Sequence, residues 1–257
     1  MPALYAHYRF GMDMLRTMPP AIQKSVQAAM PLYISGLFGP DIFHYNLCKQ
    51  VNLLASYFHG QTGSAFFSRC CQLIRQKNTA TADAYLYGLL CHYCLDSVVH
   101  STVNSICKDL PEHILMEGEF ERYLLALDQK PITWIRQIGR KLPISRQHSQ
   151  MASQLYSEVT PDTIRMCLQI MGWITQIGSA PPGPKRILAE KVLLCVSSAA
   201  HDTMIPIKPV TKFSPLNPLL LQHYQRACEI FPAMLQSLYA HRFHSTPLSP
   251  EFEPIFG

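Results

Sequence analysis

One segment of this 257-residue chain carries three potential metal ligands at regular spacing. Within Tyr85–Asn104, which reads YLYGLLCHYCLDSVVHSTVN, His92, Asp96 and His100 follow one another at intervals of four residues. Side chains four residues apart on a helix diverge by only about 40°, so these three share one stripe. Their neighbours are apolar, and a buried polar stripe is costly unless it is paired or binds a metal. The segment therefore predicts either a metal site or a hydrogen-bonded His–Asp pair beside a core histidine.

The spacing along this stripe favours more than one metal ion. His92 and His100 lie about 12 Å apart along a helix axis, which is too far for both to bind the same ion. Asp96 lies between them, and its two carboxylate oxygens can bind two different ions. We therefore expect a cluster of ions bridged by Asp96 rather than an isolated one.

A second segment offers the same kind of pair. Pro111–Glu117 reads PEHILME and places His113 and Glu117 four residues apart, on one face of a predicted helix. Together with His100 they supply two nitrogen ligands and one oxygen ligand and leave one position open, as in a catalytic zinc site. The acids that continue this helix, Glu119 and Glu121, are expected to face solvent.

Further candidates lie upstream. His59 occurs in YFHGQ just before a predicted helix, Asp41 occurs in the predicted turn GPD, and His7 occurs in AHY near the start of the sequence. His44 follows Asp41 by three residues and can be a local partner of that carboxylate. Taken singly, such residues are more often structural than metal-binding.

The elements that must position these residues are predicted to be helices. Helical periodicity dominates, and no run shows the alternation typical of strands. Proline and glycine breakers support helices near 20–30, 62–77, 80–107, 111–127, 148–158, 161–179, 184–200 and 218–240. Thr160 and Pro161 resemble a helix N-cap and first turn, and His201–Asn217 is predicted to be a long proline-rich loop. We expect one compact all-α domain over 1–257, with the metal-site half at about 1–127 and a helical half without a recognised motif at about 128–257.

Composition narrows the class of protein. Apolar residues make up 48% of the chain, which excludes a disordered chain. The net charge of +5 is far from the dense Lys/Arg clustering of a nucleic-acid binder, so no stable nucleic-acid complex is expected. The sequence shows neither a signal peptide nor 18 uninterrupted apolar residues, so we expect a cytoplasmic protein without a transmembrane segment. Peripheral contact with a membrane and the oligomeric state stay open.

The candidate residues, taken in order, resemble the pattern of the zinc-dependent phospholipase C family. The most specific part is HxxxDxxxH followed by HxxxE, and the segments MPALYAHYRFG, GLFGPDIFHY, GLLCHYCLDSVVHS and HILMEGEFERYLL are similar to its leaderless bacterial branch. The resemblance covers roughly residues 1–127. The eight matching positions are His7, Asp41, His59, His92, Asp96, His100, His113 and Glu117.

The resemblance implies an all-helical fold, shared with zinc-dependent single-strand nucleases, and two or three zinc ions. It implies one zinc on His59, His92 and Asp96, and a more open zinc on His100, His113 and Glu117. A third zinc would be held by His7 and a bridging Asp96. Asp41 would lie beside the first zinc as a general base or as a ligand. Secreted relatives place an N-terminal Trp on the third zinc, where this chain offers Met1 or Pro2, so a two-ion cluster is also compatible with the sequence.

The activity implied by the resemblance is hydrolysis of a glycerophospholipid headgroup ester by metal-activated hydroxide. Two alternatives stay open. One is a single-strand nuclease or another phosphoesterase on the same cluster, with Tyr45, Phe58 and Tyr93 as candidate substrate-binding side chains. The other is a non-catalytic protein that binds a ligand through its metal. The short interval from His100 to His113 favours the lipase.

Overall fold

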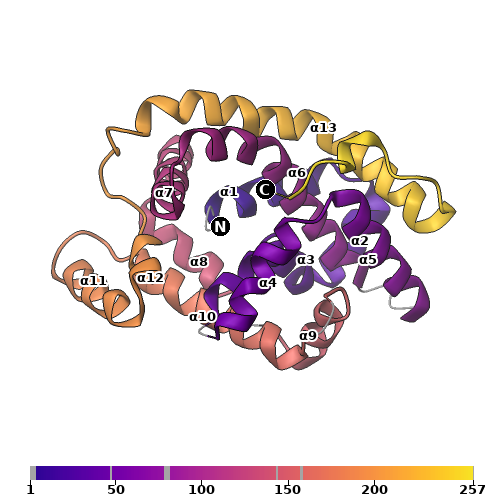
Figure 1. The fold of residues 1–257 in the computed structure, drawn as a ribbon, viewed down its shortest axis with the longest axis horizontal. Coiled ribbons are helices and arrows are strands. Elements are labelled where there is room, and N and C mark those ends of the chain that lie inside the picture. The colour runs from indigo at the N-terminus through magenta and orange to yellow at the C-terminus, as the bar shows by residue number, and fades with distance from the viewer. Residues whose placement is uncertain (1–3, 47, 78–81, 143, 157–158, 257) are drawn as a thin grey trace.

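The computed structural model describes residues 4–46, 48–77, 82–142, 144–156 and 159–256. The regular structure of this part of the chain is helical (Figure 1). Within these residues there is no strand, and one isolated antiparallel bridge joins Thr62 and Ile255. The predicted all-α fold is confirmed. No helix among the described residues is long and apolar enough to cross a bilayer.

The helices follow one another through the chain with short connections. The α-helices are α1 (Leu4–Thr17), α2 (Pro20–Ala28), α3 (Met30–Gly36), α4 (Lys49–His59), α5 (Gly63–Lys77), α6 (Ala82–Ile106), α7 (Leu110–Leu127), α8 (Arg136–Gly139), α9 (Arg146–Ser153), α10 (Pro161–Gly178), α11 (Pro184–Val196), α12 (Ser198–Asp202) and α13 (Asn217–His244). The 3-10 helices are η1 (Gly39–Tyr45), η2 (Ile132–Ile135), η3 (Ser214–Leu216) and η4 (Pro250–Phe252).

All eight predicted helices are present among the described residues, with differences at their ends. The expected ranges correspond to α2, α5, α6, α7, α9, α10, α11 and α13, although residues 80–81 and 157–158 lie outside the described part. Thr160 is the N-cap of α10, and its hydroxyl accepts a hydrogen bond from the backbone N–H of Thr163 at 3.1 Å. The segment predicted as one long loop, His201–Asn217, instead contains the end of α12 and all of η3. The α-helices α1, α3, α4 and α8 were not expected from the sequence.

The central element is α6, which carries three of the candidate ligands. It packs against α1, α3, α5, α7 and α13, and Figure 1 shows α13 running across it. Its first fifteen residues, from Ala82 to Asp96, are all buried. A helix that is apolar nearly all round is stable only when it is covered on every side, which explains this position.

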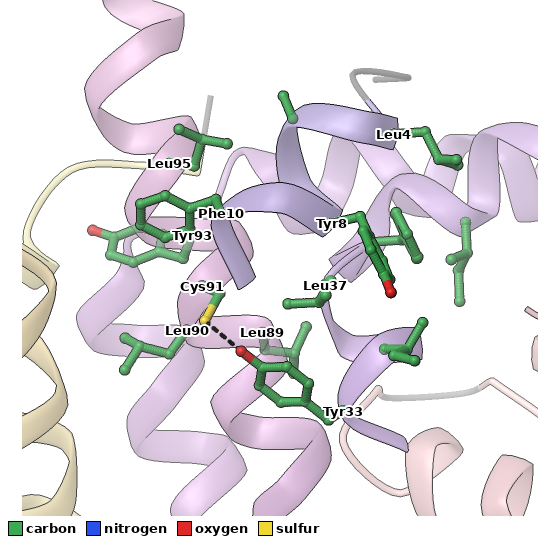
Figure 2. Packing of buried hydrophobic residues seen from close by; sticks show 14 of the residues in the cluster. Leu4, Tyr8, Phe10, Tyr33, Leu37, Leu89, Leu90, Cys91, Tyr93 and Leu95 are labelled. Carbon is green, nitrogen blue, oxygen red and sulfur yellow. Dashed lines mark hydrogen bonds between the residues drawn. The ribbon is translucent and has the colours of Figure 1, made fainter. Parts of the chain in front are cut away.

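Two glycines allow α3 to approach α6 closely. A Cβ atom placed on Gly36 would lie 2.4 Å from the carbonyl oxygen of Tyr85, and one on Gly88 would lie 2.3 Å from that of Tyr33. The Tyr33 hydroxyl donates to the carbonyl of Gly11 at 2.5 Å and lies 3.3 Å from the Cys91 Sγ, a contact visible in Figure 2. The backbones of the two helices therefore touch, and Tyr33 links α1 to both.

Substitution of Gly88 by alanine is expected to lower the free energy of unfolding by about 1–3 kcal/mol, because the added methyl group meets backbone that cannot move aside alone. The measurement is urea unfolding. Gly178→Ala is the matched control, since a Cβ there has its nearest neighbour at 3.7 Å. We expect that variant to stay within about 0.5 kcal/mol of the parent. Equal effects in both variants would contradict the close helix contact.

The acids that follow Glu117 were expected to face solvent, and that expectation is wrong. Glu119 is fully buried and accepts hydrogen bonds from the Arg122 Nε (2.8 Å), the Val210 backbone N–H (3.0 Å) and the Asn217 Nδ2 (2.8 Å). Glu121 is also buried and accepts from the backbone of α1; its burial raises the pKa of this carboxyl well above the ordinary value. Segments far away in sequence thus cover this face of α7.

Candidate metal centre

The structure brings all eight predicted metal-ligand positions into one cluster. Five elements contribute: α1 with His7, η1 with Asp41, α4 with His59, α6 with His92, Asp96 and His100, and α7 with His113 and Glu117. All of these side chains are buried except His113, which is half-buried. Asp41 lies on a 3-10 helix rather than in an isolated turn, and His59 is the last residue of α4 and precedes α5, as expected.

Gly39 determines how η1 approaches the cluster. Its φ of +40° is in the left-handed region that favours glycine, and a Cβ atom there would lie 2.4 Å from the Cδ2 atom of His92. The start of η1 therefore lies directly against the His92 ring. Asp41, two residues later, reaches the His59 Nε2 with its Oδ1 at 3.0 Å.

One group of donors consists of His59, His92 and Asp96. The His92 Nε2 lies 3.1 Å and the His59 Nε2 lies 4.0 Å from the Asp96 Oδ2. All three atoms are buried, and none has a hydrogen-bond partner of normal geometry among the described residues, although the His59 Nε2 also lies 3.0 Å from the Asp41 Oδ1. A tetrahedral zinc with bonds of about 2.1 Å separates its ligand atoms by roughly 3.4 Å, which lies between the two observed distances. The geometry therefore fits a metal ion better than a hydrogen-bonded pair.

Backbone carbonyls orient the two imidazoles of this group. The Nδ1 atom of His59 lies 2.7 Å from the Ala55 carbonyl, and that of His92 lies 3.2 Å from the Leu37 carbonyl. Because a carbonyl oxygen can only accept, each Nδ1 must carry the proton and donate. Each Nε2 then keeps a lone pair directed at the other members of the group, which is how protein metal ligands are usually oriented.

A second group joins α6 to α7. The Glu117 Oε1 lies 3.1 Å from the His100 Nε2 and 3.0 Å from the His113 Nε2. The three donor atoms lie within 4.8 Å of one another, as in the first group. Two imidazoles and one carboxylate leave one position of a tetrahedral zinc open.

Asp96 belongs to the first group and also faces His7 and the second group. Its Oδ1 lies 3.2 Å from the His7 Nε2, whereas its Oδ2 faces His92 and, at 3.8 Å, the His100 Nδ1. Burial alone would raise the pKa of this carboxyl, but the surrounding imidazoles of His92, His100 and His7 hold it well below the ordinary value. Asp96 is therefore an anion whose two oxygens face different imidazoles, and it can serve two ions at once. Met1 and Pro2, considered for a third ion, lie outside the described residues.

The cluster opens onto a cleft of about 260 Å³, lined by His44, Ser56, His59, Gly60, His100, Leu110 and His113. A second hollow of about 350 Å³ adjoins it, since His44 and Leu110 line both. The rest of the hollow is formed by Tyr45, Asn46, Asn52, Ile114, Ile174, Val196, Ser197, Ala200 and Thr203. Histidines of both donor groups thus face the same solvent-accessible space.

Of the three aromatic residues considered for substrate binding, two lie in the core and one lines the adjoining hollow. Phe58 and Tyr93 are fully buried in the core; Phe58 packs on Phe43, and the Tyr93 hydroxyl donates to the Pro254 carbonyl at 2.9 Å. Neither lines the cleft. Tyr45 is buried and lines the adjoining hollow.

His44, considered above as a local partner of Asp41, lies on η1 three residues after it. Its ligand atoms lie within 4.8 Å of those of Asp41 and His59. Residues i and i+3 of a 3-10 helix eclipse each other, so Asp41 and His44 project from η1 in the same direction. The sequence shows the interval of three residues. That both side chains project the same way follows only when the segment is known to be a 3-10 helix.

Comparison with known proteins agrees with this cluster. The family model for zinc dependent phospholipase C matches residues 6–173, which is well over half of the chain and extends from α1 into α10. The match continues past residue 127, where the sequence analysis recognised no motif. Searches of curated proteins and of solved structures gave no match. Because the family model covers most of the chain and every predicted ligand position, this chain belongs to the zinc-dependent phospholipase C family.

Proposed function

We propose that the protein is a zinc-dependent phosphodiester hydrolase that cleaves the headgroup ester of a glycerophospholipid. Family membership supports a zinc hydrolase of the phospholipase C type. The observation that carries the proposal is the cleft, which is lined by His59 from one donor group and by His100 and His113 from the other. A phosphodiester bound there meets both groups.

We assign the ions to the observed donor groups. His59, His92 and Asp96 would hold one zinc, and His100, His113 and Glu117 would hold a second. His7, beside the Asp96 Oδ1, would contribute to a third. Imidazole and carboxylate donors in this proportion favour zinc over calcium or magnesium, which prefer oxygen ligands alone.

The residues of the chain have distinct tasks in the proposed reaction. Bound zinc supplies Lewis acidity, which lets water ionise near neutral pH and offsets phosphoryl charge. Asp41 lies behind the cleft wall, against the His59 Nε2, and would orient the nucleophilic water and take its proton. The apolar side chains of the adjoining hollow, among them Ile114, Ile174 and Val196, exclude water and accommodate the lipid part of the substrate.

The lining of the cleft favours a lipid substrate over single-stranded nucleic acid. A nuclease of this type needs aromatic side chains on which bases stack beside the metal. Among the described residues, those that line the cleft include no Tyr, Phe or Trp. The hollow that continues the cleft includes Tyr45, but its other apolar lining residues are aliphatic (Leu110, Ile114, Ile174, Val196 and Ala200), which suits acyl chains.

The proposed function is tested with zinc-loaded protein on two substrates. We expect it to release the phosphorylated headgroup from phospholipid vesicles and leave diacylglycerol, to lose this activity on chelation, and to leave single-stranded DNA intact. Cleavage of DNA with no action on lipid would identify a nuclease instead. Tight zinc binding without hydrolysis of any phosphodiester would identify a binding protein.

Exposed apolar residues beside the cleft are proposed to contact the membrane. Leu53 and Tyr57 of α4 are 58% and 57% exposed. They share a helix face with Ser56 and Gly60, which line the cleft, because residues three, four and seven apart lie together on a helix. A bilayer that delivers its lipid to the cleft would therefore lie against both side chains.

The double variant Leu53→Ser/Tyr57→Ser is expected to hydrolyse vesicles about 10- to 100-fold more slowly, since full burial of each side chain contributes on the order of 1.5–3 kcal/mol and both are already partly covered in the protein. Its rate on a dispersed short-chain phospholipid should stay within about twofold of the parent. The matched control is Leu219→Ser/Tyr239→Ser on α13, where both side chains are exposed but neither lines the cleft. A similar loss on vesicles in the control would contradict the docking face.

A further inference from the structure

Helix α11 presents an apolar face to solvent. Its side chains Ile187, Leu188 and Leu194 are 56%, 64% and 54% exposed. The buried side chains of the helix, Ala189 and Leu193, lie on the opposite face. Large apolar side chains gathered on the exposed face of one helix mark an interaction surface, whereas single ones scattered over a protein do not.

A lysine lies at the centre of this face. Lys191 is exposed, and it is three or four residues from each of the three exposed apolar side chains, so all of them share one side of the helix. Lys185, which is also exposed, adds a cation near the start of the helix. The one acid of α11, Glu190, is engaged at 3.3 Å by the Nε of Arg186. The exposed surface of α11 is therefore both apolar and positively charged.

The helix is held firmly to the rest of the protein. The Nη2 atom of Arg186 donates to the carbonyl of Ile205 at 3.0 Å, and its Nη1 atom donates to the carbonyl of Ala180 at 3.4 Å. These bonds connect α11 to the segments before and after it. The helix also packs against α10 and α12, and Figure 1 shows it at the edge of the molecule. Its outward face is thus a fixed feature of the fold.

The end of α11 reaches the hollow that adjoins the metal cleft. Val196, the last residue of the helix, lines this hollow together with Ser197 and Ala200. Asn52, on α4, lines the same hollow from another helix. The apolar face of α11 therefore continues into the space that is proposed to accommodate the acyl chains, as the exposed face of α4 does into the cleft.

An anionic bilayer suits this face better than a second copy of the chain. A two-fold contact centred on the face would bring Lys191 against Lys191 of the second copy, which is repulsive. A bilayer takes the apolar side chains into its acyl boundary, while lysine stems lie along that boundary and their ammonium groups reach the phosphates of the headgroups. Each lysine near an anionic membrane surface adds to the attraction.

We propose that α11 is a membrane-docking helix that binds anionic phospholipid bilayers. Ile187, Leu188 and Leu194 enter the bilayer surface, and Lys185 and Lys191 bind its headgroups. That docking delivers lipid to the hollow rests on the function proposed above. The binding itself needs no hydrolysis, so it is measured separately.

The test is flotation of the zinc-loaded full chain with vesicles of phosphatidylcholine alone and of an equal mixture of phosphatidylcholine and phosphatidylglycerol. We expect the parent to bind the mixed vesicles more tightly and to lose this preference as salt is added. Ile187→Ser/Leu188→Ser should bind about 10- to 100-fold more weakly, because both side chains stay in water. Lys191→Gln should bind about fivefold more weakly, and only to the mixed vesicles.

The matched controls carry the same changes elsewhere on the surface. Leu219→Ser/Tyr239→Ser removes two exposed apolar side chains of α13, and Lys24→Gln removes an exposed lysine of α2. Both should bind like the parent. An equal loss in the controls, or a parent that binds neither kind of vesicle, would overturn the docking helix, as would a parental dimer that Ile187→Ser/Leu188→Ser dissociates. A parent that binds vesicles through α11 but hydrolyses no phosphodiester would overturn the proposed function and leave the docking helix in place.

Discussion

Replacement of Asp96 by alanine is expected to remove zinc from the cluster and to lower the rate of phosphodiester hydrolysis by about 10³-fold or more. Zinc contributes several kcal/mol of transition-state stabilisation, and each 1.36 kcal/mol corresponds to about a factor of ten. Asp96 should have the largest effect of any single ligand because its two oxygens face His7 on one side and His92 and His100 on the other.

The measurement for Asp96→Ala combines elemental zinc analysis with the hydrolysis rate. Asp13→Ala is the matched control, since Asp13 is a partly exposed acid that pairs with Arg16 outside the cluster. The control should keep its zinc and its rate. Full zinc content in Asp96→Ala would contradict the assignment of Asp96 as the bridging ligand.

Replacement of Asp41 by asparagine is expected to lower the rate by about 10²–10⁴-fold while the tightly bound zinc is retained, because general-base catalysis contributes about that much. The amide keeps the shape of the carboxylate but cannot accept a proton. Two three-donor groups stay complete without Asp41. They are His59, His92 and Asp96, and His100, His113 and Glu117.

Zinc content and rate are compared in Asp41→Asn under the same conditions, with Ser56→Ala as a control for a change in the cleft lining. Loss of zinc together with activity would show that Asp41 is a structural ligand, which is the alternative that the sequence left open. Retention of both zinc and rate would remove Asp41 from the mechanism altogether.

The polar stripe of α6 could be predicted from the sequence because it is a local feature. Intervals of four residues place His92, Asp96 and His100 on one helix face whatever surrounds them. The pair of His113 and Glu117 follows from the same rule. The all-α fold and most helix positions are likewise properties of local periodicity and of proline and glycine breaks.

Other features depend on contacts between distant segments. The burial of Glu119 arises because Val210 and Asn217 return to the face of α7, and no local pattern encodes that return. The helix α4 begins at Lys49 without a side-chain cap, so it lacks a recognisable start signal. The role of Gly39 is visible only when the His92 ring is placed against it.

We expect this chain to hold a cluster of zinc ions within the α6 and α7 donor groups. Elemental analysis of metal-replete protein, together with anomalous scattering from crystals at the zinc edge, tests it most directly. We expect at least two ions, one beside His92 and Asp96 and one beside His113 and Glu117. Fewer than two ions at these positions would contradict it.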